Sequence, residues 1–474
     1  MIERLSSDSR RCAPGVAFFA YPGAAADGRA HIPEAIARGA AGVLWEADGC
    51  AWRDEWRAPN APVRGLRQQA GLLAHEFYDR PSAALWTCGV TGTNGKTSCS
   101  QWIAHALSGA GAKCGVVGTL GAGFAGALVD AGYTTPDVLE LHRLLAGMRC
   151  DGAQAAAMEV SSHGLEQGRV NAVAFDCALF TNLTHDHLDY HGSMDAYAAA
   201  KARLFDASGL ACAVLNLDDA FGVQLARRCG ARGLRTIGYS LSPGAVAPGS
   251  VTEFMVASRI EPGHLSLATS WGEARTDFHQ LGRFNVANAL GVLGCLMAYG
   301  LPFGQAVAAI ATLPAVPGRM QKVGDAPLTV VDYAHSPDAL DKVLQALRPV
   351  AQARNGRLVA VFGAGGERDR GKRGLMGAVA SRLADRIVLT SDNPRSEDPL
   401  AIIRAIEQGV SALHAVEVDR ARAIDSAIAQ AADADVVLIS GKGHEAWQES
   451  GGRRLPFSDA AVALAALARR AGKR

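Results

Sequence analysis

The sequence lacks an excess of either charge and lacks paired cysteines. It has 47 Lys and Arg residues against 46 Asp and Glu residues, which leaves a formal net charge of +1. This balance offers no general attraction for a polyanion, so no nucleic-acid partner is expected. The ten cysteines form no Cys-x-x-Cys pair and no regular spacing. They are interpreted as reduced, buried thiols of a cytoplasmic protein rather than as a disulfide framework.

A long hydrophobic run is also missing. Residues 1–11 are polar and charged, so no signal peptide is expected. The longest uncharged stretch covers residues 284–318, and Asn285, Asn288 and a Gly-Leu-Pro turn interrupt it. It therefore predicts two buried helices rather than a membrane span. Hydrophobic residues still make up 49% of the 474 residues, which is enough to build the cores of two to four domains.

Strand and helix patterns predict an α/β protein of three domains. Residues 1–84 form a small N-terminal α/β domain, in which strands at 16–20 and 42–45 flank a helix at 32–38. Residues 85–317 form a central domain, because short apolar strands alternate with helices as in a P-loop ATPase-like, doubly wound, mostly parallel sheet. Residues 318–474 show the same alternation of strands and helices and form a Rossmann-like C-terminal domain. The strands are expected at 85–90, 115–118, 155–159, 178–182, 212–216, 329–332, 358–362, 386–390 and 436–440.

A glycine-rich segment follows the first strand of the central domain. Residues 89–98 read Gly-Val-Thr-Gly-Thr-Asn-Gly-Lys-Thr-Ser, and a helix is expected to begin near Lys96. Backbone N–H groups of such a turn point at phosphates, while Lys96 reaches the terminal phosphates and the Thr97 hydroxyl lies on magnesium. Val90 stands where the usual pattern has its first glycine, but the strand, loop and helix disfavour a chance glycine turn. The predicted ATP-binding residues here are Gly92, Thr93, Asn94, Gly95, Lys96, Thr97 and Ser98.

Polar residues gather where two further strands end, and ligands bind at such carboxyl ends in doubly wound sheets. Glu159 could hold the magnesium ion that Thr97 touches, or it could cap the next helix. Residues 185–191 carry three histidines and two aspartates, which suggests zinc. A second magnesium is favoured, because a site that clamps phosphates needs oxygen ligands. Tyr197 and Lys201 share one face of a later helix, although a helical lysine is usually solvated.

Other candidates follow towards the C-terminus. Asn285 and Asn288 open an apolar helix, where they could bind an adenine or a phosphate or cap the helix. Arg319, at a domain joint, could reach a terminal phosphate, and Asp332 ends a strand as a ribose-binding carboxylate does. The cationic loop 363–373 suits an anionic substrate. It is not a dinucleotide fingerprint, because Arg368 replaces the third glycine.

Together these motifs resemble the Mur ligase family across essentially all of the chain. The shared motifs are the Gly-Thr-Asn-Gly-Lys-Thr loop, the Asn-x-x-Asn pair, Pro-Gly-Arg and Asp-Tyr-Ala-His. Motifs at 8–10, 159–165, 186–191 and 441–445 are similar to those of the members that add the third residue of the peptidoglycan stem peptide. The Asp-Asn-Pro-Arg sequence at 392–395 resembles the signature of members that add meso-diaminopimelate rather than lysine.

The resemblance implies a role for each matching position. Lys96, Lys201, His187 and Arg319 would be catalytic. Lys201 would be carbamylated to N6-carboxylysine and would join His187, Thr97 and Glu159 as magnesium ligands. The uridine substrate would contact residues 23–26 together with Ser7, Ser9, Thr134, Thr135, Ser161, Gln167 and Arg169. Diaminopimelate would contact Arg368, Asp392, Asn393, Pro394, Arg395, Gly441 and Glu445.

The activity that the resemblance implies is an amide ligation in cytoplasmic peptidoglycan precursor synthesis, with ATP and Mg²⁺ as cofactors. A monomer would join UDP-N-acetylmuramoyl-L-alanyl-D-glutamate to meso-diaminopimelate through an acyl phosphate. A lysine-adding or folate-tailing ligase of the same fold, a non-catalytic ATP switch and an oxidoreductase are the alternatives. Two features depart from the family pattern: about seven residues precede the Asp-Ser-Arg motif, so a leading segment is expected to be shortened, and Ser98 replaces a threonine.

Overall fold

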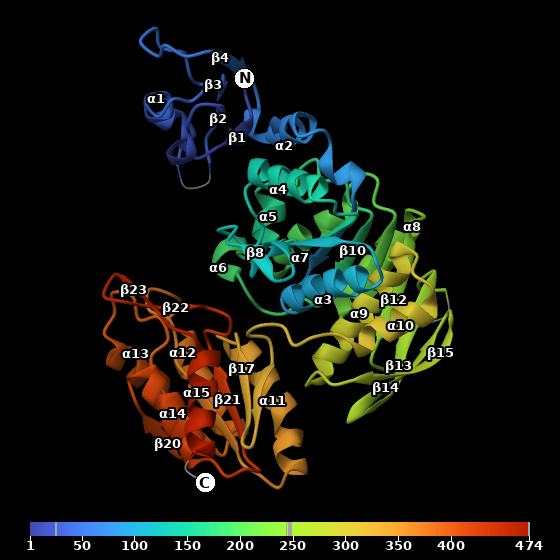
Figure 1. The fold of residues 1–474 in the computed structure, drawn as a ribbon, viewed down its shortest axis with the longest axis vertical. Helices are drawn as coiled ribbons and strands as arrows, with labels where there is room; N and C mark the ends of the chain where they lie inside the picture. Colours follow the sequence, from blue (N-terminus) through green and yellow to red (C-terminus); the bar gives the residue numbers. More distant parts are fainter. Residues whose placement is uncertain (24–25, 243, 245–248, 473–474) are drawn as a thin grey trace. The chain divides into compact units, whose positions relative to one another are not determined.

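The chain divides into two compact units in a computed structural model that describes residues 1–23, 26–242, 244 and 249–472. Unit 1 comprises Met1–Phe278 and Ala287–Leu313, and unit 2 comprises His279–Val286 and Pro314–Arg474. Both units are α/β, as the sequence predicts (Figure 1). Among the described residues, no helix is both long enough and apolar enough to cross a membrane.

Unit 1 begins with a four-stranded parallel sheet in the order β1-β2-β3-β4. All five residues of β2 are apolar and buried, so this strand forms the centre of the small core. The predicted strands at 16–20 and 42–45 and the predicted helix at 32–38 are confirmed. The elements are β1 (Arg4–Ser6), β2 (Val16–Ala20), β3 (Gly42–Glu46), β4 (Asn60–Val63), α1 (Ile32–Ala37), α2 (Leu66–Phe77), and the 3₁₀ helices η1 (Ser9–Arg11), η2 (Gly28–His31) and η3 (Pro81–Ala84).

The rest of unit 1 is built on an eleven-stranded sheet in the order β15-β14-β13-β12-β11-β10-β5-β9-β6-β7-β8. Its strands from β13 to β6 are parallel, and each of the five predicted strands is present. The strands are β5 (Trp86–Thr91), β6 (Cys114–Gly118), β7 (Gly121–Phe124), β8 (Ala127–Val129), β9 (Ala155–Glu159), β10 (Cys177–Phe180), β11 (Cys212–Asn216), β12 (Arg235–Ser240), β13 (Glu253–Glu261), β14 (Gly263–Thr269) and β15 (Gly272–Phe278).

Antiparallel hairpins extend this sheet at both edges, which the sequence analysis did not foresee. β13, β14 and β15 pair antiparallel at one edge, and β6, β7 and β8 do so at the other. In β15, buried and exposed residues alternate near the end of the strand, as expected for a strand with one solvated face. The sheet is therefore mixed, with a parallel centre that carries the polar strand ends.

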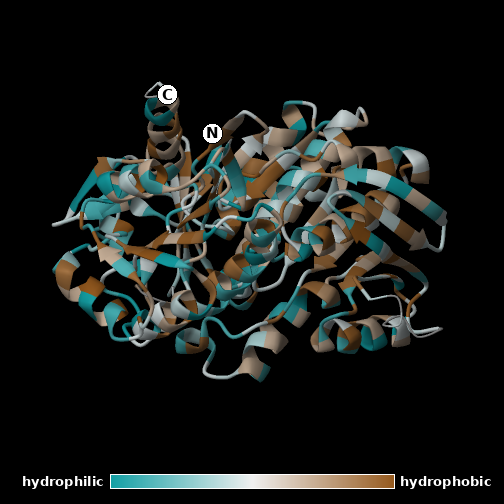
Figure 2. Cartoon of the chain, turned by 90° about the horizontal axis from the view of Figure 1, so that it is seen from below, coloured by the Kyte–Doolittle hydropathy of each residue, from teal (hydrophilic) through white to brown (hydrophobic). Residues whose placement is uncertain are grey.

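Helices cover both faces of the large sheet. Residues of α4 and α8 share a core with the sheet on one face, whereas α3, α9 and α10 lie on the other (Figure 1). α9 and α10 are the two buried helices predicted at 284–318. Figure 2 shows that hydrophobic residues concentrate in the strands and on the inner sides of the helices. The helices are α3 (Lys96–Gly109), α4 (Val138–Cys150), α5 (Ser162–Glu166), α6 (Leu188–His191), α7 (Met194–Ala202), η4 (Arg203–Asp206), α8 (Ala220–Ala231), α9 (Arg283–Tyr299) and α10 (Phe303–Ala311).

Unit 2 contains a six-stranded sheet in the order β16-β17-β21-β18-β19-β20. Only β16 is antiparallel, and two hydrophobic cores lie on opposite faces. Its strands are β16 (Gln321–Asp325), β17 (Leu328–Asp332), β18 (Leu358–Phe362), β19 (Arg386–Leu389), β20 (His414–Val416) and β21 (Val436–Ser440), followed by a hairpin of β22 (Trp447–Ser450) and β23 (Arg453–Pro456). Its helices are α11 (Pro337–Ala353), α12 (Lys372–Leu383), α13 (Pro399–Glu407), α14 (Arg420–Gln430) and α15 (Asp459–Ala471).

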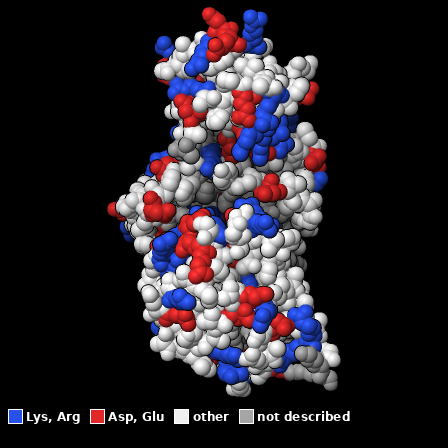
Figure 3. All heavy atoms as spheres, turned by 90° about the vertical axis from the view of Figure 1, so that its left-hand side faces the viewer, with Lys and Arg blue, Asp and Glu red and all other residues white. Residues whose placement is uncertain are grey.

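Surface charges reflect the balanced composition. On the face shown in Figure 3, Lys and Arg side chains are interspersed with Asp and Glu side chains. Many of them pair over short sequence distances, such as Arg38 with Glu34 and Arg80 with Glu76. Exposed pairs of this kind contribute about 0–1 kcal/mol each. Their main consequence is a surface without a dominant sign.

Candidate active site

The predicted phosphate loop joins β5 to α3 as expected. Gly92 and Gly95 both have positive φ angles, of 149° and 88°. A Cβ atom at Gly95 would lie 2.5 Å from the Asn288 Oδ1 atom, and one at Gly92 would collide with the Thr181 hydroxyl. These two positions therefore require glycine for both conformation and space. The helix N-terminus at Lys96 then directs its backbone N–H groups into the loop, as anion binding needs.

Residues that follow β10 hold the loop from outside. The Asn94 backbone N–H donates to Asn182 Oδ1 over 3.1 Å, and the Asn182 amide donates back to the Asn94 carbonyl over 3.0 Å. The Thr181 hydroxyl also donates to the Asn94 carbonyl, over 2.6 Å. Because β10 is the direct neighbour of β5, its carboxyl end fixes the shape of the loop.

Thr97 and Glu159 meet at the bottom of the loop. The Thr97 hydroxyl donates to Glu159 Oε2 over 3.0 Å, and both side chains are buried. Thr119 donates to the same carboxylate through its backbone N–H over 2.7 Å and through its hydroxyl over 3.1 Å. Ser161, rather than Glu159, caps α5. The capping interpretation of Glu159 is therefore wrong, and a carboxylate and a hydroxyl, both suited to Mg²⁺, lie together.

Lys201 is buried instead of solvated. Its ammonium donates to the Gly92 carbonyl over 2.9 Å and lies 4.3 Å from the centre of the Tyr197 ring. Lys96 donates to the same carbonyl over 2.9 Å. Burial, followed by repulsion from Lys96, lowers the pKa of Lys201 well below its ordinary value. Lys201 is thus an amine with a strongly reduced tendency to carry a proton, next to the phosphate loop.

Aromatic and imidazole rings surround Lys201. His187 lies at the start of α6 with a φ of 53°, and its ring centre is 6.1 Å from that of Tyr197. Burial, opposed in part by Asp186, lowers the pKa of His187, so the neutral imidazole can act as a ligand. Within the described residues, the side chains of 185–191 do not bring three ligand atoms close enough to share one ion. Their arrangement in the described structure therefore gives no support to a zinc site made of these residues alone.

A pocket of about 690 Å³ lies among residues of the small sheet and residues that follow β8 and α5. Four predicted contacts of the uridine substrate line it: Ser7, Ser9, Gln167 and Arg169. Gly23 and Ala26 also line it, whereas Ala24 and Ala25 lie outside the described residues. The lining also includes five arginines, at positions 4, 10, 11, 67 and 169. Their guanidinium groups suit a ligand that carries phosphates.

A chain of polar contacts connects this pocket to Glu159. Arg169 donates to Gln167 Oε1 over 3.0 Å and to the Thr135 carbonyl over 2.8 Å. The Thr135 hydroxyl lies 3.0 Å from the Ser161 hydroxyl and donates to the Glu159 carbonyl. The Thr134 hydroxyl is 3.1 Å from that of Thr119. The predicted residues Thr134, Thr135 and Ser161 thus form a path between the pocket and the phosphate loop.

In unit 2, Asp332 ends β17 and accepts the backbone N–H groups of Met320 and Ala334, each over 2.7 Å. Burial raises the pKa of Asp332. The Arg319 guanidinium lies 4.6 Å from the centre of the Tyr333 ring, on which it can stack. Asp332 therefore ends β17 as the sequence analysis expects, and Arg319 contacts the residue that follows it, Tyr333.

The predicted amino-acid site forms a compact cluster at the ends of β19 and β21. The Asn393 amide donates to Glu445 Oε2 over 2.8 Å. The buried Lys442 ammonium donates to Asn393 Oδ1 and to Glu445 Oε2, each over 3.0 Å. Gly441, with a φ of 122°, leaves space beside the Asp392 carboxylate. This cluster fixes the position of Glu445, whose side chain remains 20% exposed and can meet a cation.

Arg395 occupies a backbone conformation that is unusual for its residue type. Its φ is 53°, and its backbone N–H and carbonyl bond Glu449 and Gly451 over 3.1 and 2.7 Å. The Arg395 guanidinium donates to the Gly366 carbonyl. A non-glycine residue in this region is strained by about 1–3 kcal/mol and is held there by its surroundings. Arg368 is exposed on the same side, in the loop after β18.

The two asparagines on α9 make different contacts. Asn288 lies against Gly95 of the phosphate loop, and its backbone carbonyl accepts the Cys99 thiol over 3.8 Å. Asn285 is buried and donates its side-chain amide to the Leu281 carbonyl over 2.8 Å. The contact with Gly95 favours a nucleotide role for Asn288.

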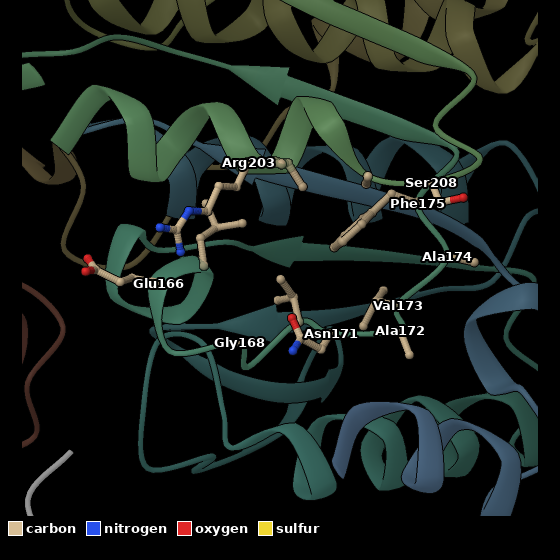
Figure 4. A pocket seen from close by; sticks show the side chains of 13 residues that line it. Glu166, Gly168, Asn171, Ala172, Val173, Ala174, Phe175, Arg203 and Ser208 are labelled. Atoms are coloured by element: carbon tan, nitrogen blue, oxygen red, sulfur yellow. The ribbon is translucent and has the colours of Figure 1, made fainter. Parts of the chain in front are cut away.

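A second hollow of about 530 Å³ lies in unit 1 (Figure 4). None of its lining residues belongs to the predicted set; they are Leu165, Glu166, Gly168, Val170, Asn171, Ala172, Val173, Ala174, Phe175, Arg203, Leu204, Ala207 and Ser208. In Figure 4 the Arg203 guanidinium and the Glu166 carboxylate lie on the same side of it. The pocket that contains the predicted residues is the larger of the two.

Comparisons with known proteins agree with this geometry. The model described as "Mur ligase family, catalytic domain" matches residues 1–78, "Mur ligase middle domain" matches 90–296, and "Mur ligase, glutamate ligase domain" matches 318–443. A relative from Chromobacterium violaceum is 51% identical over 98% of this chain and 94% of its own. The chain belongs to the Mur ligase family. The predicted family resemblance is thereby confirmed.

Two relatives of this Mur ligase bear the same name, UDP-N-acetylmuramoyl-L-alanyl-D-glutamate–2,6-diaminopimelate ligase. They are the Chromobacterium violaceum protein and a Pseudomonas aeruginosa protein that is 50% identical over 99% of this chain and 95% of its own. A solved structure of a ligase with that name is 35% identical, has a TM-score of 0.69 and covers 99% of this chain and 95% of that chain. The MurF ligase of Thermotoga maritima in complex with ADP is 18% identical, with a TM-score of 0.65 over 100% and 98% of the chains, and it supports the fold alone.

Some functional contacts were not predicted. The roles of Thr119 and Asn182 depend on neighbouring strands, which a linear sequence does not pair. Lys442 lies within the quoted 441–445 motif, yet nothing in the sequence shows that its ammonium is buried between Asn393 and Glu445. A lysine between two glycines after a buried strand was the available signal.

Proposed function

We propose that this protein is an ATP-dependent ligase that adds meso-diaminopimelate to UDP-N-acetylmuramoyl-L-alanyl-D-glutamate in peptidoglycan precursor synthesis. The observation that carries the proposal is the 51% identity, over 98% of the chain, to a ligase of that name. The phosphate loop, the arginine-rich pocket and the Asn393–Glu445 cluster supply one site type for each of the three substrates.

ATP would bind at the phosphate loop of residues 92–98. Backbone N–H groups and the Lys96 ammonium would neutralise its terminal phosphates, and Asn288 would contact it beside Gly95. Asn285, Arg319 and Asp332 are proposed as further nucleotide contacts. Thr97 and Glu159 fit Mg²⁺, because they offer a hydroxyl and a carboxylate within one buried hydrogen bond. Such an ion supplies charge neutralisation on the transferring phosphoryl group.

The reaction has two displacement steps. First, a D-glutamate carboxylate oxygen attacks the γ-phosphorus, ADP leaves, and an acyl phosphate forms. Second, the diaminopimelate amine attacks the acyl carbon, inorganic phosphate leaves, and the amine releases its proton. Lys96 and Arg319 would stabilise the phosphoryl charge. The path of Thr134, Thr135, Ser161, Gln167 and Arg169 would hold the peptide end of the uridine substrate.

Lys201 is proposed to carry a carbamate. Its lowered pKa and buried position favour the neutral amine, which can attack carbon dioxide and lose a proton to give an anionic N-carboxylate. That group would provide oxygen ligands for a second Mg²⁺ together with His187. An ammonium could not act as a ligand there, because it carries no free lone pair.

The distal end of diaminopimelate carries one carboxylate and one ammonium. Arg395 would pair with the carboxylate, and Glu445 would pair with the ammonium. Arg368, Asp392, Asn393, Pro394 and Gly441 would complete the site. Lysine lacks the distal carboxylate, so it would leave the Arg395 guanidinium unpaired. Arg395 is half-buried, and leaving such a charge without its carboxylate costs up to about 2–5 kcal/mol, which favours diaminopimelate.

The work is proposed to divide among three segments. Residues 1–84 would bind the uridine nucleotide end, 85–317 would bind ATP, and 318–474 would bind the amino acid. We further propose that the protein acts in the cytoplasm, because ATP and a UDP-linked peptidoglycan precursor are both substrates of the reaction. We also propose that it acts as a monomer.

Phosphate release tests the proposal. The wild-type protein with ATP and Mg²⁺ should release phosphate only when the uridine dipeptide and meso-diaminopimelate are both present. The matched control is Lys96→Ala, which should release none under any condition. A non-catalytic ATP switch is the second candidate, because it would require the phosphate loop alone. Phosphate release that ignores diaminopimelate would support the switch and contradict the ligase.

A further inference from the structure

Three cysteines from different parts of the sequence meet in the centre of unit 1. Cys88 of β5 pairs in register with Cys177 of β10, and Cys295 of α9 packs above them. The Cys295 sulfur is 3.7 Å from that of Cys88 and 4.0 Å from that of Cys177. The three sulfurs all lie within 4.8 Å of one another. Among the described residues, this is the one group of three or more His, Cys, Asp or Glu side chains close enough to share an ion.

A fourth cysteine extends the group. Cys177 also pairs in register with Cys212 of β11, so Cys88, Cys177 and Cys212 form a row across three neighbouring strands. The Cys212 thiol is a hydrogen-bond partner of Cys177. All four side chains are buried. We call Cys88, Cys177 and Cys295 the thiol triangle, and Cys212 its neighbour.

The spacing of the triangle matches a metal–thiolate site. Three sulfurs that each lie about 2.3 Å from a shared ion are about 4 Å apart. Here two of the sulfur–sulfur distances are 3.7 and 4.0 Å, and the third is within 4.8 Å. A disulfide would require the sulfurs of one pair to come to about 2.05 Å and would leave the third cysteine unused. Soft sulfur ligands select thiophilic cations over Mg²⁺ or Ca²⁺. We propose that the thiol triangle is a binding site for one thiophilic cation of the Zn²⁺ or Cu⁺ class, separate from the ligase site.

The chemistry of binding is a proton-for-metal exchange. Each S–H bond that breaks gives its proton to water, and one metal–sulfur bond forms in its place. The Cys88 thiol already donates to the Cys295 sulfur over 3.7 Å, so two of the ligand sulfurs are in direct contact. Two thiolates and one neutral thiol around a divalent ion give no net charge, which suits a core without nearby charged partners.

The site would join elements that build the phosphate loop. β5 leads directly into the loop, and α9 carries Asn288 beside Gly95. A bound ion would link these two elements through Cys88 and Cys295. Because the three cysteines are buried in the finished core, the ion would enter during folding.

The test uses the full-length protein, refolded under reducing conditions with Zn²⁺ alone, with Cu⁺ alone or with Mg²⁺ alone. After removal of loose ions with a weak chelator, we expect about one Zn²⁺ or Cu⁺ and no Mg²⁺ per chain. X-ray absorption of the bound ion should show a shell of sulfur at about 2.3 Å. Refolded wild-type protein that retains neither ion would overturn the proposal. A shell of nitrogen or oxygen would overturn it too.

Matched variants locate the site. Cys295→Ala removes a ligand and should lower the affinity by more than 100-fold, whereas Cys212→Ala alters only a neighbour and should lower it by about 10–100-fold. Cys114→Ala is the control, because Cys114 is buried in β6 outside the triangle, and it should leave the affinity unchanged. Equal affinity in all three variants would place the ion elsewhere and refute the proposal. Loss of two hydrogens on oxidation, with no metal bound, would identify a disulfide instead.

Discussion

The phosphate loop of unit 1 and the amino-acid cluster of unit 2 both hold polar groups in fixed positions, but they do so in different ways. At the loop, the main chain positions these groups, through glycines with positive φ and a helix N-terminus. At the cluster, side chains position these groups, because the Lys442 ammonium donates hydrogen bonds to Asn393 and Glu445. A main-chain site tolerates few residue types, so its sequence is recognisable. A side-chain network depends on which strands are neighbours, so much of it is visible only in the fold.

The largest effect is expected at the phosphate loop. Lys96→Ala should reduce ligation by at least about 10³-fold, because the terminal phosphates lose their cation during transfer. Binding of diaminopimelate should persist, since its proposed contacts lie in unit 2. Turnover and isothermal binding measured on the folded variant would check both. Near-normal turnover would break the assignment of the loop.

The next effect concerns Lys201. Lys201→Ala should be nearly inactive, and short carboxylates such as acetate should restore part of the activity by replacing the carbamate oxygens. Lys342→Ala, at an exposed ion pair on α11, is the control and should behave like the wild type. The hypothesis fails if Lys201→Ala stays active, or if mass spectrometry and a high-resolution structure show an unmodified ammonium.

In unit 2, Arg395 tests whether one side chain sets selectivity. Arg395→Ala should lower kcat/KM for meso-diaminopimelate by roughly 10²- to 10³-fold, which corresponds to about 3–4 kcal/mol. Use of lysine should stay low, because removing a cation does not build a lysine site. A change in diaminopimelate use of less than about threefold would show that Arg395 does not read the distal carboxylate.

Lys442 tests the side-chain network itself. Lys442→Met keeps the length and apolar part of the side chain but removes two hydrogen bonds, so Glu445 loses its orientation. We expect KM for diaminopimelate to rise by about 10-fold, and KM for ATP to stay unchanged. Lys322→Met, at an exposed pair in β16, is the matched control. Equal rises in both KM values would indicate a general loss of structure in place of a positioning role.

The last effect is on stability and comes from His142 in unit 1. Burial lowers its pKa to about 4, while its Nε2 atom bonds the Asn171 carbonyl over 3.0 Å. The unfolded chain binds this proton near pH 6.5 and the folded chain does not, so stability should fall as the pH drops from about 6.5 to 4. The contribution is at most about 3 kcal/mol. In chemical unfolding experiments, His142→Gln should reduce the change in the free energy of unfolding between pH 6.5 and 4. An unchanged pH dependence in this variant would contradict the role of His142.

Much of the fold followed from local pattern. The strands at 155–159, 212–216, 358–362 and 436–440 have the predicted bounds, because continuous apolar runs between polar ends specify buried parallel strands. The β13–β15 hairpins were missed, since their alternating polar residues give a weak signal. Polar strand ends also led to Glu159 and Asp332. By contrast, the burial of Lys201 was not visible, because helical spacing gives the face but not what packs on it.

The most direct test of the account is a competition between the two amino acids. Wild-type protein receives ATP, Mg²⁺ and the uridine dipeptide with equal amounts of meso-diaminopimelate and lysine, and mass spectrometry identifies the products. The account predicts the diaminopimelate adduct almost alone, with one ADP formed for each adduct. Equal amounts of the lysine adduct, or ADP formation without any adduct, would contradict it.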